Sequence, residues 1–181
     1  MGQYYKVLVT DEKGQEKIYE PNGLKLIEHS WWYNPFCSTI AKKLFDKPHK
    51  IAWVGDYSNE DSDRLQELGI DYSKIWGEEN ERAEISKLRR NELDLDTVKY
   101  LVNVDKEIFI DLKEYKEASQ DRDGNALFPL SLLTALGNGK GGGDYFGEEG
   151  EGFVGYWAND TIYFSNTEPK SYEKVDISFW Y

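Results

Sequence analysis

"KYLVNVDKEIFIDL", at residues 99–112, decides the fold because two short apolar runs flank a polar turn. The runs at 101–104 and 108–110 are rich in β-branched and aromatic residues, which is typical of strands. Asp105 and Lys106 lie between them, where a turn is expected. The stretch therefore predicts a β-hairpin.

A second hairpin is predicted near the start of the chain, in "YYKVLVTDEKGQEKIYEP" at 4–21. Apolar residues alternate there, and residues 12–15 supply the turn. Both hairpins lead to an apolar segment, "GLKLIEH" at 23–29 and "PLSLLTA" at 129–135. Each segment then leads to a W-x-x-D motif, in "IAWVGDY" at 51–57 and "VGYWAND" at 154–160. The ordered recurrence predicts an internal duplication of about 4–57 and 99–164. Chance matches in an aromatic-rich chain are the alternative.

Helical patterns lie mainly between the two predicted copies. Asn34 and Pro35 are a good N-cap and first residue for a helix over 36–45. A short helix is predicted in 59–69, ended by Gly69, and another in 78–94. "VDISFWY" at 175–181 is typical of a last strand. We predict a single α+β domain over 1–181, with a mostly antiparallel sheet, helices on one face, two diverged ββ(α)β repeats and a helical insert at 58–98.

The charge of the chain limits its partners. It has 34 acidic and 22 Lys or Arg residues, with a net charge of −12. Broad DNA or RNA binding needs a basic stripe, so it is not expected. An acidic surface suits a basic protein or ribonucleoprotein partner, including one that normally holds nucleic acid. Aromatic residues make up 15% of the chain and favour a contact surface. Simple solubility is the alternative explanation of the acidity.

The cellular location is predicted to be cytoplasmic, without membrane insertion. The single cysteine, Cys37, excludes an intramolecular disulfide. The N-terminal stretch lacks a secretory pattern, and no apolar run approaches the roughly 20 residues that span a bilayer.

A glycine-rich stretch, "GNGKGGGDYFG" at 137–147, contains a G-x-G-x-x-G match. A dinucleotide fold requires a helix directly after it, and the acidic, glycine-rich sequence that follows does not predict one. A Walker A motif is also excluded, because Lys140 is followed by Gly141. We expect a loop that needs positive φ angles or close backbone approach. Lys140 and Asp144 are candidate functional residues on it, and a solvated loop is the alternative.

His29, in "EHSWW", is the best acid–base candidate in a chain with two histidines. Metal-free RNA cleavage needs a base, an acid and a cation. His29, Tyr5 and Lys140, with Asp144, would suffice if the fold brings them together. A structural histidine is the alternative.

Further residues are predicted to bind a partner or ligand: Trp31, Trp32, Tyr145 and the two motif aspartates, Asp56 and Asp160. A structural role in turns is the main alternative for the aspartates. No zinc spacing or complete calcium loop is present, so no metal site is predicted. Magnesium stays possible at the carboxylates near Asp56 and residues 60–63.

Several of these stretches together resemble a family of uncharacterised small proteins from Gram-positive bacteria and their phages and plasmids. They are "MGQYYK", "GLKLIEHS", "VGDY", "YLVNVDKEIFIDL", "GNGKGGGDY" and "VGYWAND". The chain departs from the family pattern at Val104, where a histidine often follows the asparagine, and at Asn159, where glycine is usual. The resemblance implies an origin in a mobile element. Size, acidity and aromatic content are similar to those of anti-CRISPR inhibitors of type II effectors.

Three functional hypotheses follow. The first is an inhibitor or interaction protein from a mobile element that acts on a nucleic-acid-handling enzyme, such as a CRISPR effector nuclease or its guide RNA. The second is a small hydrolase or ribonuclease with a site between the repeats. The third is a ligand-binding or toxin-immunity module in which the glycine loop closes over its ligand.

Overall fold

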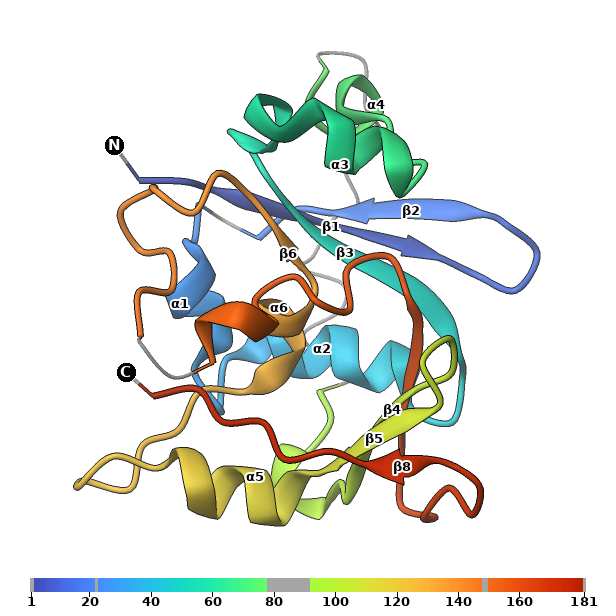
Figure 1. The fold of residues 1–181 in the computed structure, drawn as a ribbon, viewed down its shortest axis with the longest axis vertical. Coiled ribbons are helices and arrows are strands. Elements are labelled where there is room, and N and C mark those ends of the chain that lie inside the picture. Colours follow the sequence, from blue (N-terminus) through green and yellow to red (C-terminus); the bar gives the residue numbers. More distant parts are fainter. Residues whose placement is uncertain (1, 22, 78–91, 148–149, 181) are drawn as a thin grey trace.

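The computed structural model describes residues 2–21, 23–77, 92–147 and 150–180. The fold is α+β, with an eight-stranded mixed and mostly antiparallel sheet among these residues (Figure 1). The strands are β1 Tyr5–Thr10, β2 Glu16–Tyr19, β3 His49–Gly55, β4 Tyr100–Asn103, β5 Ile108–Asp111, β6 Ala135–Leu136, β7 Thr161–Ser165 and β8 Glu173–Lys174. The α-helices are α1 Leu26–Ser30, α2 Pro35–Leu44, α3 Ser62–Glu67, α4 Tyr72–Trp76, α5 Leu112–Ser119 and α6 Pro129–Leu133.

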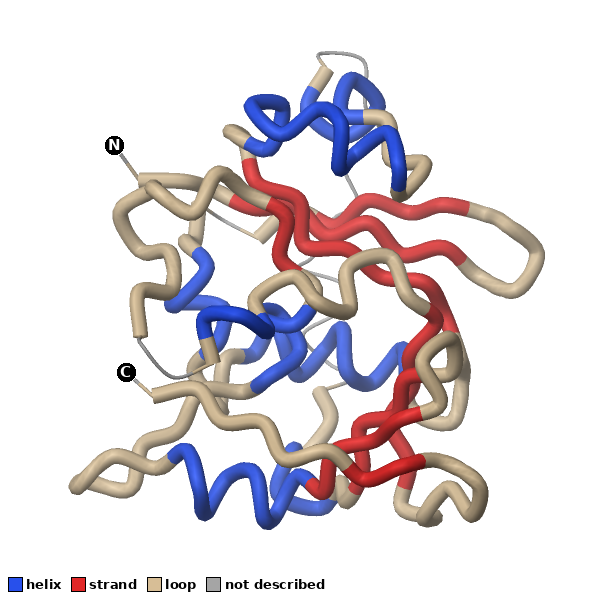
Figure 2. The backbone as a smooth tube through the Cα atoms, viewed as in Figure 1, coloured by secondary structure: helices blue, strands red, loops and turns tan. Residues whose placement is uncertain are grey.

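Both predicted hairpins are confirmed. Strand β1 pairs with β2, and β4 pairs with β5. The main path of the sheet is β2-β1-β3-β7-β4-β5-β8, with β6 paired to β3. Strands β3 and β7 join the two halves of the sheet, as the tube in Figure 2 shows. The duplication itself stays a prediction, because Trp53 lies inside β3 whereas Trp157 lies in a turn before β7.

The helix predicted after Asn34 is confirmed as α2. The Asn34 side chain accepts hydrogen bonds from the backbone N–H groups of Phe36 and Cys37, as an N-cap does. The helix predicted in 59–69 is confirmed as α3, and Gly69 follows it with a φ of 68°. Of the helix predicted over 78–94, residues 78–91 lie outside the described residues.

Helices cover both faces of the sheet, so the prediction of one covered face was wrong. Val7 and Trp53 join the main core with residues of α1, α2 and α6. Leu8 and Val54 point to the opposite face, where they pack with residues of α3 and α4. Successive strand residues alternate between faces, so a strand that is apolar at consecutive positions needs cover on both. Figure 1 shows α3 and α4 on one side of β1–β3 and α1, α2 and α6 on the other.

The predicted last strand at 175–181 was also wrong. The final strand is the short β8, which pairs with β5 in parallel, and residues 175–180 form no strand. Phe179 is instead fully buried in the main core and packs against the rings of Tyr115 and Tyr145. The backbone N–H of Val175 still donates to the carbonyl of Phe109 over 2.9 Å, and beyond it the burial of aromatic side chains holds the segment in place.

Candidate functional site

The glycine loop, defined as residues 137–147, is tied to the first strand by a buried hydrogen-bond network. The Tyr5 hydroxyl donates to Oδ1 of Asp144 over 2.8 Å. Oδ2 of the same carboxylate accepts the backbone N–H of Gly141 over 2.8 Å. The amide of Gln3, oriented with its nitrogen toward Asp144, donates to Oδ2 over 2.9 Å and accepts the N–H of Tyr57. The network therefore joins two predicted site residues and holds the loop against β1.

Close approach explains two of the glycines in this loop. A Cβ atom on Gly137 would lie 2.5 Å from the Tyr5 hydroxyl. A Cβ atom on Gly141 would collide with the Gln3 side chain and lie 2.9 Å from its backbone nitrogen. Only glycine fits at such distances. This agrees with the expectation that the loop requires close backbone approach.

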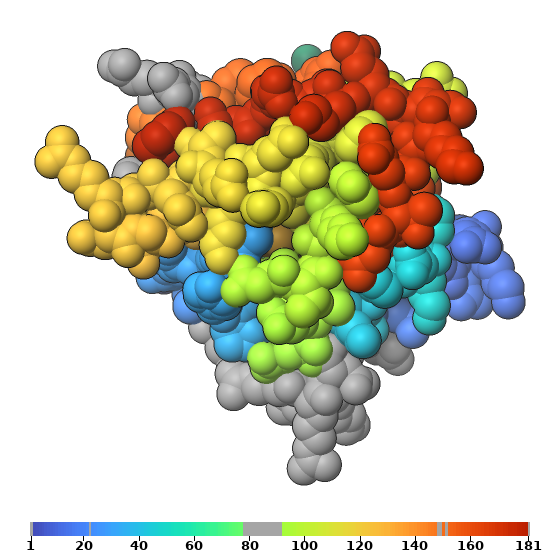
Figure 3. All heavy atoms as spheres, turned by 90° about the horizontal axis from the view of Figure 1, so that it is seen from below, coloured from blue at the N-terminus to red at the C-terminus, as the bar shows by residue number. Residues whose placement is uncertain are grey.

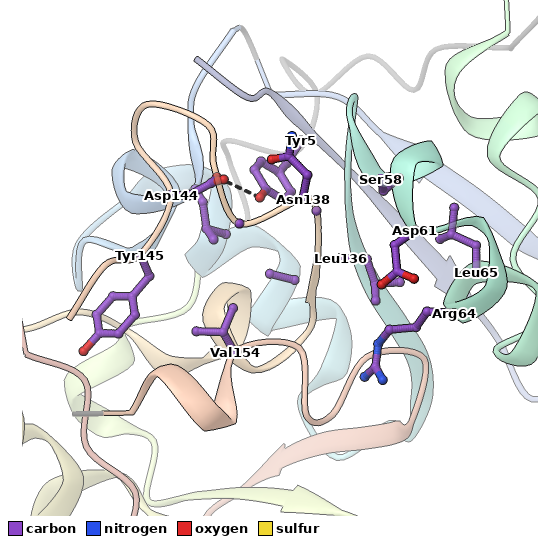
Figure 4. Close-up of a pocket in the computed structure, with 14 residues that line it drawn as sticks. Tyr5, Ser58, Asp61, Arg64, Leu65, Leu136, Asn138, Asp144, Tyr145 and Val154 are labelled. Atoms are coloured by element: carbon purple, nitrogen blue, oxygen red, sulfur yellow. Dashed lines mark hydrogen bonds between the residues drawn. The ribbon is translucent and has the colours of Figure 1, made fainter. Parts of the chain in front are cut away.

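A pocket of about 300 Å³ lies between the glycine loop and the segment that carries α3 (Figure 4). Tyr5 and Asp144 lie at one side of it, and Asp61 and Arg64 lie at the other. Apolar side chains, including Leu136 and Val154, lie between these polar groups. The pocket thus combines an apolar middle with charged groups at two sides, which is typical of small-molecule sites.

Burial determines the protonation of the two network residues. Burial, together with the charge of Asp144, raises the pKa of the Tyr5 hydroxyl above its ordinary value, so this group stays protonated at neutral pH. Burial also raises the pKa of the Asp144 carboxyl, although the hydrogen bonds from Tyr5 and Gly141 act in the opposite direction. Tyr5 is therefore a hydrogen-bond donor in this site and not a base.

Tyr145 also lines the pocket, and its hydroxyl accepts the backbone N–H of Trp180 over 2.9 Å. Lys140 is exposed and is not among the pocket-lining residues. Its backbone N–H donates to Oδ1 of Asn138 over 3.0 Å. The fold therefore brings Tyr5, Asp144 and Tyr145 to one pocket and leaves Lys140 at the solvent side of the loop.

His29 has no solvent exposure. The indole N–H of Trp53 donates to its Nδ1 over 2.6 Å, so Nε2 carries the proton of the neutral ring. Nε2 makes no hydrogen bond of ordinary geometry with the described residues. Burial lowers the pKa of His29 to about 3, with the backbone of Leu24 acting in the opposite direction. A sealed, neutral ring gives no geometric support to acid–base catalysis.

The two motif aspartates occupy structural positions. Oδ1 of Asp56 accepts the backbone N–H of Tyr4 over 3.1 Å, and burial raises the pKa of this carboxyl. Oδ2 of Asp160 accepts from Nδ2 of Asn103 and from Nζ of Lys106, at 2.7 and 2.5 Å. Asp56 thus fixes the start of β1, whereas Asp160 anchors the turn between β4 and β5.

A second hollow, the aromatic cleft, contains the two predicted tryptophans. It has a volume of about 360 Å³ and is lined by Glu28, Trp31, Trp32, Tyr33, Asn34, Lys116, Gly124, Asn125 and Ala126. Trp31 is 38% exposed and Tyr33 is 71% exposed, whereas Trp32 is buried. Figure 3 views the molecule from the side on which α5, the loop at 120–125 and the segments at 31–34 and 92–98 lie close together. Two large aromatic rings are therefore open to a partner.

Asp96 organises the aromatic cleft. Its Oδ1 accepts the indole N–H of Trp32 over 2.9 Å, and its Oδ2 accepts the Tyr33 hydroxyl over 3.0 Å. Nζ of Lys116 lies 2.7 Å from Oδ1 of Asp96, and 4.7 Å and 5.2 Å from the ring centres of Trp32 and Tyr33. This cluster already stabilises one cation against aromatic faces.

Protonation in the cluster follows from these contacts. Burial alone would raise the pKa of the Asp96 carboxyl, but hydrogen bonds from Lys116, Tyr33 and Trp32 lower it below its ordinary value. Burial alone would lower the pKa of the Lys116 ammonium, but its hydrogen bonds to Asp96 and Tyr33 raise it. Both groups are therefore charged at neutral pH.

Sequence reasoning missed Arg64, Asp96 and Lys116 as lining or organising residues, and it named Asp61 only among the carboxylates that could hold magnesium. Each is one charged residue among many in the chain, and only the fold brings it to a hollow. Among the described residues, no group of three or more His, Cys, Asp or Glu side chains could hold a metal ion. No helix in the described part of the chain is long and apolar enough to cross a membrane. Comparisons with protein-family models, curated proteins and solved structures find no match.

Proposed function

We propose that this protein is an inhibitor or interaction protein that binds a basic partner, of the kind that handles nucleic acid. The observation that carries the proposal is the aromatic cleft, in which Trp31 and Tyr33 are exposed beside the partly exposed ion pair of Lys116 and Asp96. Tryptophan and tyrosine are enriched among the residues that dominate binding energy at protein interfaces.

The charge around the aromatic cleft supports a cationic partner. Glu28 lines the cleft. Asp121 lies in the adjoining loop, where its carboxylate accepts hydrogen bonds from Asn125. The chain as a whole has a net charge of −12. Such a field increases the association rate of a basic protein. An arginine side chain of that partner would stack on an exposed aromatic ring.

A type II CRISPR effector with its guide RNA is the first partner to test. Effectors of this kind hold nucleic acid in a positively charged channel, which is the complement of an acidic protein. The sequence resemblance to proteins of mobile elements points to the same class. An RNA-cleaving enzyme receives less support, because His29 is sealed in the core and Lys140 does not line the pocket.

The test is a titration of the purified effector ribonucleoprotein with this protein, followed by isothermal calorimetry at low and high salt. The proposal predicts a complex that weakens with salt and is disrupted by the double variant Trp31→Ala, Tyr33→Ala. The matched control is Phe153→Ala, which removes an exposed aromatic outside the cleft. Equal binding by the double variant would exclude the cleft as the interface.

A ligand-binding module is the second candidate, and the pocket beside the glycine loop favours it. This pocket places the Tyr5–Asp144 pair opposite Arg64 across apolar side chains. A ligand that binds only the folded state raises the melting temperature. A thermal-shift screen of nucleotides and sugars therefore tests this candidate, and loss of a shift in Arg64→Ala would place the ligand in this pocket.

A further inference from the structure

A basic groove lies beneath the β1–β2 hairpin, away from both hollows described above. This hairpin groove has a volume of about 220 Å³ and is lined by Val9, Asp11, Gln15, Lys17, Tyr19, Lys43, Lys47 and His49. Lys17 comes from β2, Lys43 from α2 and His49 from the start of β3. In Figure 1 the tip of the hairpin projects to the right, and α2 lies below the strands β1–β3. Three elements therefore direct basic residues to one place.

The positive charge in the hairpin groove has little local compensation. Asp11 is the only carboxylate that lines it. Oδ1 of Asp11 accepts the backbone N–H groups of Lys13 and Gln15, so this carboxylate stabilises the hairpin turn. None of the lining lysines forms an ion pair with another described residue. Such a cluster is notable in a chain with 34 acidic residues and only 22 Lys or Arg.

Lys43 is the most constrained of these lysines. It is half-buried, and its ammonium lies 5.1 Å from the centre of the Tyr19 ring. Burial lowers its pKa, and no carboxylate opposes this effect. Charges that are removed from water normally have a paired partner, and clustered like charges destabilise the fold. A bound anion would relieve both penalties.

The helix dipole explains only part of this arrangement. Lys43 lies in the last turn of α2 and Lys47 follows it, where cations interact favourably with the helix C-terminus. Lys17 lies on β2, across the groove, so the dipole of α2 does not explain its position. The Nδ1–H group of His49 donates to the Lys47 carbonyl over 2.8 Å, which orients the ring at the groove.

We propose that the hairpin groove is a binding site for a phosphate group, carried by a nucleotide or by an RNA strand. Lysine side chains bind phosphate as flexible point charges. Three lysines and one histidine in the groove would attract the negative charge of a phosphate group. The volume suits a phosphate or pyrophosphate group, with the rest of the ligand outside. The inference is independent of the proposed protein partner, because it uses other residues.

The first experiment measures the melting temperature in sodium pyrophosphate against sodium chloride of equal ionic strength. Pyrophosphate should raise the melting temperature of the wild-type protein and should not raise that of the double variant Lys43→Ala, Lys47→Ala. Lys50→Ala is the matched control, since Lys50 neighbours His49 but does not line the groove. The proposal would be overturned if pyrophosphate did not raise the melting temperature of the wild-type protein, or if it raised that of the double variant by the same amount.

The second experiment identifies the source of the phosphate by calorimetry with a nucleoside diphosphate and with a short single-stranded RNA that lacks terminal phosphates. Binding of the nucleotide alone indicates a terminal phosphate, and binding of the RNA indicates the phosphodiester backbone. In either case the double variant should bind at least roughly tenfold more weakly, with Lys50→Ala unchanged. Binding of neither ligand would contradict the assignment.

Discussion

The Tyr5 hydroxyl and the Asp144 carboxylate, 139 residues apart in sequence, share a 2.8 Å hydrogen bond inside the protein. Through this bond the first strand fixes the conformation of the glycine loop. Because Asp144 is only 4% exposed, loss of one donor leaves a buried carboxylate less well satisfied.

Tyr5→Phe should therefore lower the free energy of unfolding by about 1–3 kcal/mol. Urea denaturation measures this change. Tyr4→Phe removes a hydroxyl from the neighbouring residue, whose side chain is exposed, and should change the stability little. Equal effects of the two variants would show that the buried bond does not hold the loop.

His29 makes the stability of the protein depend on pH. Its pKa is about 3 in the folded protein against 6.5 in the unfolded chain. Between these values the unfolded chain binds a proton that the folded protein does not, so the free energy of unfolding falls as the pH falls from 6.5 towards 3. The loss of unfolding free energy caused by His29 reaches about 4 kcal/mol at the lower end of this window.

His29→Gln tests this dependence, because the amide oxygen can accept the Trp53 indole N–H without titrating. Unfolding free energies of the two proteins are measured from pH 7 down to pH 4. As the pH falls, the unfolding free energy of the wild-type protein should decrease more than that of His29→Gln. Parallel curves over the whole range would mean that His29 is not a buried neutral base.

Gly141→Ala should destabilise the protein by about 1–3 kcal/mol, since the new Cβ atom collides with Gln3. Gly152→Ala is the matched control, because nothing lies within 4 Å of its added Cβ atom, and it should change the stability by less than about 0.5 kcal/mol. Thermal and urea unfolding measure both. A neutral Gly141→Ala would show that the loop is free to move away from β1.

The neighbouring tryptophans Trp31 and Trp32 should have opposite roles. Trp32→Ala removes a buried ring that packs on Phe128 and bonds Asp96, and should cost about 3–5 kcal/mol of stability. Trp31 is 38% exposed, and its replacement by alanine should cost about 1 kcal/mol but weaken partner binding. Denaturation and calorimetry separate the two effects. A Trp31→Ala variant with full binding would contradict the assignment.

Local patterns were sufficient for the hairpins and for α2 and α3. Alternation and turn residues predict the strand pairs, and Asn34, Pro35 and Gly69 set helix ends through short-range hydrogen bonding and backbone freedom. The second covered face was missed, although residues 51–55 are apolar or small without interruption. A continuous apolar run implies a strand buried on both sides.

The candidate sites were predictable only in part. Tyr5, Asp144 and Tyr145 were named from the sequence, but they come together only through a contact between segments 139 residues apart. The burial of His29 could not be predicted, since Glu28 and Ser30 flank it in sequence and Trp53 covers it from strand β3. Asp96 and Lys116 carry no local signal, because their partners come from distant segments.

The most direct test of the central claim is a calorimetric titration with a short arginine-rich peptide, which represents the basic surface of a partner. The account predicts saturable, salt-sensitive binding by the wild-type protein, with loss of binding in Trp31→Ala, Tyr33→Ala and no loss in Phe153→Ala. Binding that is absent in the wild type, or unchanged in the double variant, would contradict the account.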